Sequence, residues 1–375
     1  MELYPYFHIA PKLLEAAQRA EELARPQFRE IESIQRYNQQ KMLAAFNRAG
    51  VSESHFVGST GYGYGDRGRD VLDQVYAYAF GAEDALVRHN FVSGTHTLTV
   101  ALFGVLRPGD KMLCVTGTPY DTIQGVIGMS GREEPGCLKE FGIQYEELDL
   151  RPDGMPDLEA MEQRISPEYK MIYIQRSRGY SLRPSLRVED IAPTGGYIAG
   201  RRDLVELCSY RLTTPGTGRE IGCTLGNNRE LFMGAFHAPH VAGEALKTAV
   251  FASALFSQLG FGVTPTVEEK RGDIIQVMML ENAKNLIAFC KGVQKGAPVD
   301  SFVVPEPSDM PGYDSQVIMA AGAFTLGSSI ELSADAPLRE PYAAWMQGGL
   351  NYHSGQLGML LAAQEMLDEG LLNLQ

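Results

Sequence analysis

Short apolar strand candidates alternate with helical or loop segments through the middle of this 375-residue chain. Helices are expected over residues 69–80 and 96–106, and strands over residues 111–116, 144–148, 171–175 and 195–199. Alternation of this kind is typical of an α/β domain with a mostly parallel sheet. It therefore constrains the fold of the chain more than any single motif does.

The two ends of the chain have different patterns. Residues 11–50 have the apolar spacing of an amphipathic helix, which predicts an N-terminal helical arm. A long helix over 238–259 is followed by a strand over 273–280, a helix over 283–295, a pair of strands near 315–332 and a helix over 355–369. We therefore expect three parts: an arm (1–50), a large α/β domain (51–245) and a smaller α+β domain (246–375).

Charge and hydropathy exclude several kinds of partner. The formal net charge of −13 repels phosphate backbones, so nucleic acid is not an expected partner. The best membrane-span candidate, residues 248–261, is interrupted by polar residues and is shorter than a span of roughly 18 apolar residues. The start of the chain has no secretion signal, and the five cysteines form no CxxC pair. These features favour a cytoplasmic protein with free thiols.

The turn Ser93-Gly94-Thr95 precedes a predicted helix. At a helix start, free backbone amides, hydroxyls and the helix dipole converge, which suits an anion, although a plain helix cap is the alternative. His96 could lay its ring on a planar ligand there, or could simply pack. Tyr120 follows a predicted strand, where ligands gather in α/β sheets, but core packing explains it equally well.

Residues 63–68 match the pattern GxGxxG, but no strand precedes them, so dinucleotide binding is not expected. The alternatives are an uncommitted surface loop and a loop that presents Tyr62, Tyr64 and Arg67 to an anionic ligand. His237 and His240 lack further ligands at metal-binding spacing, so no metal site is predicted. Arg339 fits either a surface salt bridge or a clamp for a substrate carboxylate.

The order of these segments and their amino-acid sequences resemble one family over nearly the whole chain: the methionine gamma-lyase-like or aluminium-resistance proteins. The motifs that carry the resemblance are Gly61-Tyr62-Gly63-Tyr64, Gly81-Ala82-Glu83-Asp84-Ala85-Leu86-Val87-Arg88, Val92-Ser93-Gly94-Thr95-His96, Pro119-Tyr120-Asp121-Thr122, Leu138-Lys139-Glu140-Phe141-Gly142-Ile143, Ile174-Gln175-Arg176-Ser177-Arg178-Gly179-Tyr180, Ala192-Pro193-Thr194-Gly195-Gly196-Tyr197-Ile198-Ala199-Gly200, Pro298-Val299-Asp300-Ser301-Phe302, Asp309-Met310-Pro311-Gly312-Tyr313 and Glu331-Leu332-Ser333-Ala334-Asp335. The family is a cystathionine lyase-related branch of the fold-type-I enzymes, which depend on pyridoxal 5'-phosphate.

The resemblance implies a role for each candidate residue. Ser93, Gly94 and Thr95 would hold the cofactor phosphate, and His96 or Tyr120 would stack on the pyridine ring. Tyr64 or Arg67 would reach the phosphate of a neighbouring subunit, which implies a homodimer or homotetramer. Arg339 would bind the α-carboxylate of an amino-acid substrate.

The chain departs from the family where catalysis should lie. Such enzymes need a lysine that binds the cofactor covalently and an acid that protonates the ring nitrogen. The family carries both between the segments that correspond to residues 174–180 and 192–200, but no lysine occurs here between Lys170 and Lys247. Two βα units at roughly 30 residues each are missing, so the chain is short by about 50 to 70 residues at the 191/192 junction. No catalytic residue is therefore assigned, and a deletion, a faulty gene model and an omitted segment would all produce this junction.

The implied activity is cleavage of a carbon–sulfur bond in an amino acid such as methionine or cystathionine. An aldolase-type cleavage of another amino acid is the alternative enzyme, because fold and cofactor do not fix the reaction. A non-catalytic relative is the third alternative, and the absent lysine favours it for the chain as written.

Overall fold

The computed structural model describes residues 3–129, 131, 133–176, 179–183, 196–310, 313–324 and 330–374. These residues form two compact units. The α/β unit holds residues 37–183 and 196–238, and the terminal unit holds residues 3–36 and 239–374. The boundaries fall inside two long helices, α1 (Pro11–Ala49) and α7 (Asn228–Gln258). The three-part division expected from the sequence stays a prediction.

The α/β unit alternates helices and strands as the sequence predicted. Its elements are η1 (Glu53–Phe56), α2 (Arg67–Phe80), β1 (Asp84–Val87), α3 (Gly94–Val105), β2 (Lys111–Cys114), α4 (Asp121–Ile127), β3 (Gln144–Glu147), α5 (Leu158–Arg164), β4 (Tyr169–Tyr173), β5 (Tyr197–Gly200), α6 (Arg202–Leu212) and η2 (Gly218–Glu220). Helix α2 ends at Gly81, whose φ of 63° suits a residue without a Cβ.

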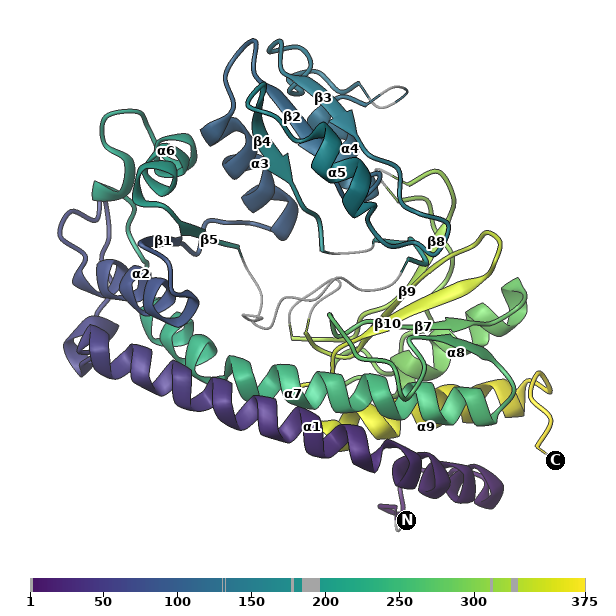
Figure 1. Cartoon of the computed structure of the whole chain (residues 1–375). Helices are drawn as coiled ribbons and strands as arrows, with labels where there is room; N and C mark the ends of the chain where they lie inside the picture. The colour runs from purple at the N-terminus through teal and green to yellow at the C-terminus, as the bar shows by residue number, and fades with distance from the viewer. Residues whose placement is uncertain are drawn as a thin grey trace. The chain divides into compact units, whose positions relative to one another are not determined.

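The described strands of this unit form two sheets, not one. Strands β3, β2 and β4 pair in that order and in parallel, which confirms the parallel arrangement for this part. Strands β1 and β5 pair with each other and are antiparallel, so the prediction of a mostly parallel sheet holds only for the first group. Figure 1 shows the β1 and β5 pair apart from the β2 to β4 sheet.

Helix α3 packs against both sheets of the α/β unit. Leu102 and Leu106 join the cluster of β2 and α4, whereas Val100 joins the cluster of β1 and α6. The contact with α6 is close: a Cβ at Gly104 would lie 3.0 Å from the Cα of Cys208. This packing on two sides fixes the position of the N-terminus of α3.

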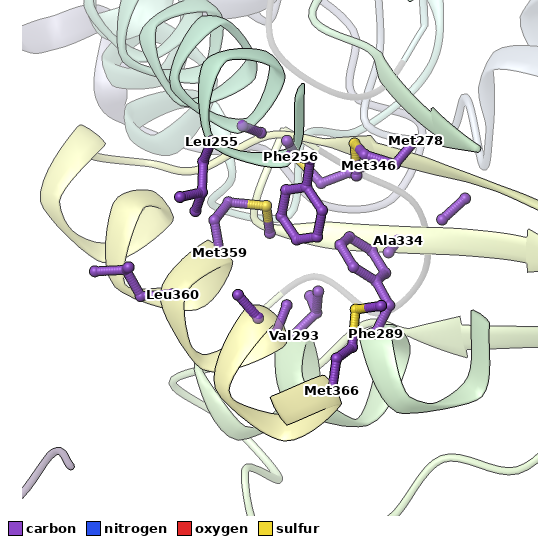
Figure 2. Packing of buried hydrophobic residues seen from close by; sticks show 14 of the residues in the cluster. Leu255, Phe256, Met278, Phe289, Val293, Ala334, Met346, Met359, Leu360 and Met366 are labelled. Carbon is purple, nitrogen blue, oxygen red and sulfur yellow. The ribbon is translucent and has the colours of Figure 1, made fainter. Parts of the chain in front are cut away.

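The terminal unit contains a five-stranded antiparallel sheet in the order β6, β7, β10, β9, β8. Its strands are β6 (Gly262–Thr264), β7 (Gln276–Met279), β8 (Val317–Ala320), β9 (Ser333–Pro337) and β10 (Ala343–Gln347), and its further helices are α8 (Ala283–Lys295) and α9 (Tyr352–Asp368). Figure 2 shows the core beside the sheet, where Phe256 of α7 and Phe289 of α8 meet at 5.2 Å between ring centroids.

The strand predictions for the terminal unit were only partly right. Strand β8 lies in the predicted region, but β9 begins after it, and β6 and β10 were not predicted. Four of the five residues in β9 are buried, and so are four of the five in β10. A strand buried on both faces shows no alternation of polar and apolar residues, so its sequence lacks the usual signal.

No described helix is long and apolar enough to span a membrane.

Candidate functional site

The N-terminus of α3 is open. Ser93 is the cap residue, with extended backbone, and its Oγ accepts a hydrogen bond of 3.0 Å from the His96 amide. The amides of Gly94 and Thr95 begin the helix, so they have no carbonyl one turn earlier to bond. Ser93 and Gly94 are exposed, and nothing lies within 4 Å of a Cβ placed on Gly94. An anion could therefore reach these two amides.

Tyr120 meets the first turn of α3. It follows β2 as the cap residue of α4, and its hydroxyl lies 3.0 Å from Thr95 Oγ1. Thr95 Oγ1 is also 3.0 Å from Thr122 Oγ1. The structure thus brings together two predicted site residues, Thr95 and Tyr120, and adds Thr122, which sequence reasoning did not single out. The only available signal for Thr122 was its place in the motif of residues 119–122.

The ring of His96 has a different environment. Its Nδ1 lies 3.2 Å from the Val92 amide, which donates to it, and the ring meets Phe91 edge to face at 6.0 Å between centroids. These contacts hold the imidazole against the loop before the helix. They favour packing for His96 and leave Tyr120 as the better candidate for contact with a planar ligand.

Asp66 holds the GxGxxG segment, residues 63–68, in place through its own hydrogen bonds. This buried carboxylate caps α2 through the Arg69 amide at 3.0 Å and accepts hydrogen bonds from three side chains. The three donors are the hydroxyls of Ser59 and Thr224 and the Asn228 amide. Burial alone would raise the pKa of Asp66, but the hydrogen bonds outweigh it and lower the pKa below its ordinary value.

Arg69 also holds the GxGxxG segment in place, through backbone carbonyl groups. Its side chain is fully buried, and Nη1 donates to the carbonyl oxygens of Gly63 and Gly222, both at 3.0 Å. Gly63 has a φ of 66°, and a Cβ there would lie 2.7 Å from the Cα of Cys223. The glycines of this GxGxxG pattern therefore serve a tight loop and a close backbone approach, and no strand precedes them, as expected.

Tyr62, Tyr64 and Arg67 project from this anchored loop. The two tyrosines are 75% and 67% exposed, with their ring centroids 5.9 Å apart. Arg67 is exposed and lies 3.4 Å from Nε2 of His55, whose pKa is lowered by burial and by this guanidinium. No hydrogen bond joins Tyr64 or Arg67 to residues 93–96 in the described part of the chain. Their predicted reach to another subunit stays a prediction.

The other polar candidates lie apart from this site. Arg339 occupies an exposed turn between β9 and β10 of the terminal unit, and no ion pair involves it among the described residues. His240 Nδ1 lies 2.9 Å from the side-chain amide of Gln35. Among residues with described positions, no three histidines, cysteines or carboxylates gather at a possible metal site.

Two lysines of the α/β unit, Lys111 and Lys139, are paired with carboxylates. Lys111 pairs with Glu168 at 2.8 Å and stands at the opposite end of β2 from Tyr120, with the four-residue strand alone spanning roughly 10 Å. Lys139 pairs with exposed Glu133 at 3.1 Å. In the terminal unit, Lys247 lies between Glu32 and Glu244, at 3.0 and 3.2 Å.

Comparison with known proteins identifies the family. The family model described as methionine gamma-lyase matches residues 13–193 and 190–367. The match covers nearly the whole chain, but it comes in two pieces that meet at residues 190–193. This is the junction at which the sequence predicted a missing interval.

Two relatives resemble the chain over almost its full length. The uncharacterized protein YnbB of Bacillus subtilis is 40% identical, and the alignment spans 92% of this chain and 94% of that protein. The alignment has 395 positions but covers about 345 of the 375 residues here, so YnbB has about 50 residues without a counterpart in this chain. The crystal structure of a carbon-sulfur lyase involved in aluminum resistance, from Clostridium novyi, is 44% identical with a TM-score of 0.90, and 96% of each chain is covered.

A more distant structure supports the fold. The pyridoxal-5'-phosphate dependent protein YhfS of Escherichia coli has a TM-score of 0.54 at 15% identity, over 89% of this chain and 97% of that one. At this identity the likeness shows the fold alone, the α/β fold of the fold-type-I enzymes. The family match and the close relatives establish that the chain belongs to the methionine gamma-lyase family.

Proposed function

We propose that this chain derives from a carbon–sulfur lyase that uses pyridoxal 5'-phosphate to cleave a sulfur amino acid such as methionine or cystathionine. We further propose that the chain as written binds the cofactor without catalysing this reaction. The observation that carries the first part is the open N-terminus of α3 with Tyr120 attached to its first turn. The similarity to the Clostridium novyi carbon-sulfur lyase supports the choice of reaction.

The residues at α3 fit the phosphate end of the cofactor. The amides of Gly94 and Thr95 point out of the helix start, where the helix dipole favours an anion, and the space beside Gly94 is open. The Tyr120 ring, tied to the same helix turn, would contact the pyridine ring. When bound, the cofactor withdraws electrons from the α-carbon of an amino acid, which is the chemistry that carbon–sulfur cleavage requires.

The second part of the proposal rests on the lysines. Only Lys41, Lys111, Lys139 and Lys170 lie in the α/β unit. Lys247 is a poor substitute for the missing catalytic lysine. Burial alone would lower the pKa of Lys247, but Glu32 and Glu244 outweigh burial and raise it. The amine therefore stays protonated. A protonated amine is not a nucleophile.

The chain between β4 and β5 is also too short to hold the two βα units that the family carries there. Only 23 residues separate Tyr173 from Tyr197, whereas two βα units need about 60. Strands β4 and β5 belong to different sheets, and the relative YnbB has about 50 residues more. These three observations support an interval missing from this chain, with the catalytic lysine inside it.

Covalent trapping tests both parts. The 375-residue chain and YnbB would each be incubated with pyridoxal phosphate, reduced with borohydride and mapped by mass spectrometry, with thiol release measured on methionine and cystathionine. We expect a single labelled lysine and thiol release for YnbB only, with reversible cofactor binding by this chain. Stoichiometric labelling of one lysine here, with thiol release, would overturn the proposed inactivity, and cleavage of a carbon–carbon bond by YnbB would favour the aldolase-type alternative.

Two finer roles remain proposals. Tyr64 or Arg67 would complete the phosphate site of a second subunit in a homodimer or homotetramer, and Arg339 would bind the substrate carboxylate. The exposed positions of all three residues are compatible with these roles. Light scattering that shows only monomers at micromolar concentration would contradict the first role.

A further inference from the structure

The hydroxyl of Thr95 is already engaged by two neighbours. It lies 3.0 Å from the Tyr120 hydroxyl and 3.0 Å from Thr122 Oγ1. A hydroxyl has one proton to donate and two lone pairs to accept with, so Thr95 can donate to one neighbour while it accepts from the other. Thr122 therefore helps to keep the Thr95 hydroxyl in the orientation that meets Tyr120.

The base of Tyr120 is fixed by a second, independent contact. Gly179, in the loop after β4, has a φ of 54°, and a Cβ on it would lie 2.6 Å from the Cβ of Tyr120. No side chain other than hydrogen fits between the two residues. The backbone of Gly179 therefore lies directly against the Cβ of Tyr120.

The two contacts restrain the Tyr120 ring at both ends. A tyrosine side chain has two rotatable bonds before its ring, and here the Cβ abuts Gly179 while the hydroxyl is tied to α3. We infer that Thr122 and Gly179 are positioning residues, which hold the Tyr120 ring beside the start of α3 in the orientation that a bound pyridine ring would meet. This inference rests on the proposed cofactor.

The backbone amide of Thr95 takes no part in either side-chain contact, so it stays available to a phosphate. Loss of the Thr122 hydroxyl should then disturb the ring end of the ligand and spare the phosphate end. Inorganic phosphate binds only at the phosphate end, whereas pyridoxal phosphate uses both ends, so comparing the two affinities separates the ring end from the phosphate end.

The variants are Thr122→Val, which removes the hydroxyl at nearly constant shape, and Thr122→Ser, which keeps it. Gly179→Ala is compared with Gly142→Ala, because Gly142 has a φ of 76° but no atom nearer than 3.9 Å to its Cβ position. The second pair separates displacement of Tyr120 from the general cost of a left-handed alanine.

The first measurement uses pyridoxal phosphate and inorganic phosphate with each chain. We expect Thr122→Val and Gly179→Ala to weaken pyridoxal phosphate binding about tenfold and to change the circular dichroism of the bound cofactor, with phosphate affinity within twofold of the parent. Thr122→Ser and Gly142→Ala should behave like the parent. Unchanged cofactor affinity and dichroism in both Thr122→Val and Gly179→Ala would overturn the inference.

The second measurement needs no ligand and separates this inference from the proposed function. In urea unfolding, the midpoint shifts of Tyr120→Phe and Thr122→Val should be clearly non-additive in the double variant, because both act on the Thr95 hydroxyl. Additive shifts would overturn the positioning role even if the cofactor binds. Non-additive shifts in a parent chain that binds no pyridoxal phosphate would support the restraint on Tyr120 and overturn the proposed function instead.

Discussion

Two glycine-containing turns of the α/β unit contrast in how they use their polar groups. In the loop of residues 58–66 and the first turn of α2, Asp66 and Arg69 are buried, and their hydrogen bonds stay inside the unit. At the turn of residues 93–95, Ser93 and Gly94 are exposed, and the first helical amides face open space. The buried polar groups of the GxGxxG loop hold the fold together, whereas the first amides of α3 are open to solvent. Substitutions in the two turns should therefore affect different properties.

Removing the Asp66 carboxylate should give the largest loss of stability. Asp66→Ala leaves the buried donors of Thr224, Asn228 and Ser59 without their acceptor, so the free energy of unfolding should fall by about 4 kcal/mol. Asp157→Ala is the control, because Asp157 caps α5 through the Ala160 amide alone; it should cost about 1 kcal/mol. Urea unfolding measures both, and equal losses would show that the Asp66 network adds nothing to an ordinary cap.

The glycines of the anchored loop should differ from one another. Gly61 and Gly63 both have left-handed backbone, but only at Gly63 would a Cβ meet backbone atoms, those of Cys223 at 2.7 Å. We expect Gly63→Ala to lower the free energy of unfolding by about 3 kcal/mol and Gly61→Ala by about 1 kcal/mol. A small effect at Gly63 would mean that the loop can move away from residue 223, contrary to the close approach described above.

The Asp66 network should also respond to pH. Because the pKa of Asp66 is lowered in the folded protein from an ordinary value of 3.8, its contribution is complete above that value and is lost as the pH falls through the folded pKa. The stability difference between the parent and Asp66→Asn should therefore shrink by about 1 kcal/mol between pH 5 and pH 3. Urea unfolding at four pH values tests this. A stability difference that grows on acidification would contradict a lowered pKa for Asp66 in the folded protein.

The exposed turn should show the smallest effects on stability. Ser93→Ala removes the side-chain acceptor for the His96 amide and should cost about 1 kcal/mol. Gly94→Ala should change the free energy of unfolding by less than about 0.5 kcal/mol, because its Cβ would meet nothing. Thermal unfolding measures both. A loss at Gly94 as large as that at Gly63 would remove the contrast between the two turns.

The local pattern of the chain predicted many elements correctly. Helix α8 was predicted at its observed bounds, α1 to within one residue, and the cap at Ser93 and the stop at Gly81 were recognised. These features depend on residues a few positions apart, so the sequence reports them directly. Strand β10 was not predicted, and β9 begins just after the range in which a second strand was expected. Burial of most residues in both strands removes the alternation that would have located them.

The sequence by itself determined the family resemblance, the candidate residues around Ser93 and the absence of a lysine between Lys170 and Lys247. Tertiary structure alone decided which candidates meet. It places Thr95 beside Tyr120 and Thr122, and it brings the Thr224 hydroxyl to the Asp66 carboxylate. Such contacts join residues separated along the chain, as Asp66 and Thr224 are, and local spacing holds no information about which distant segment will supply the partner.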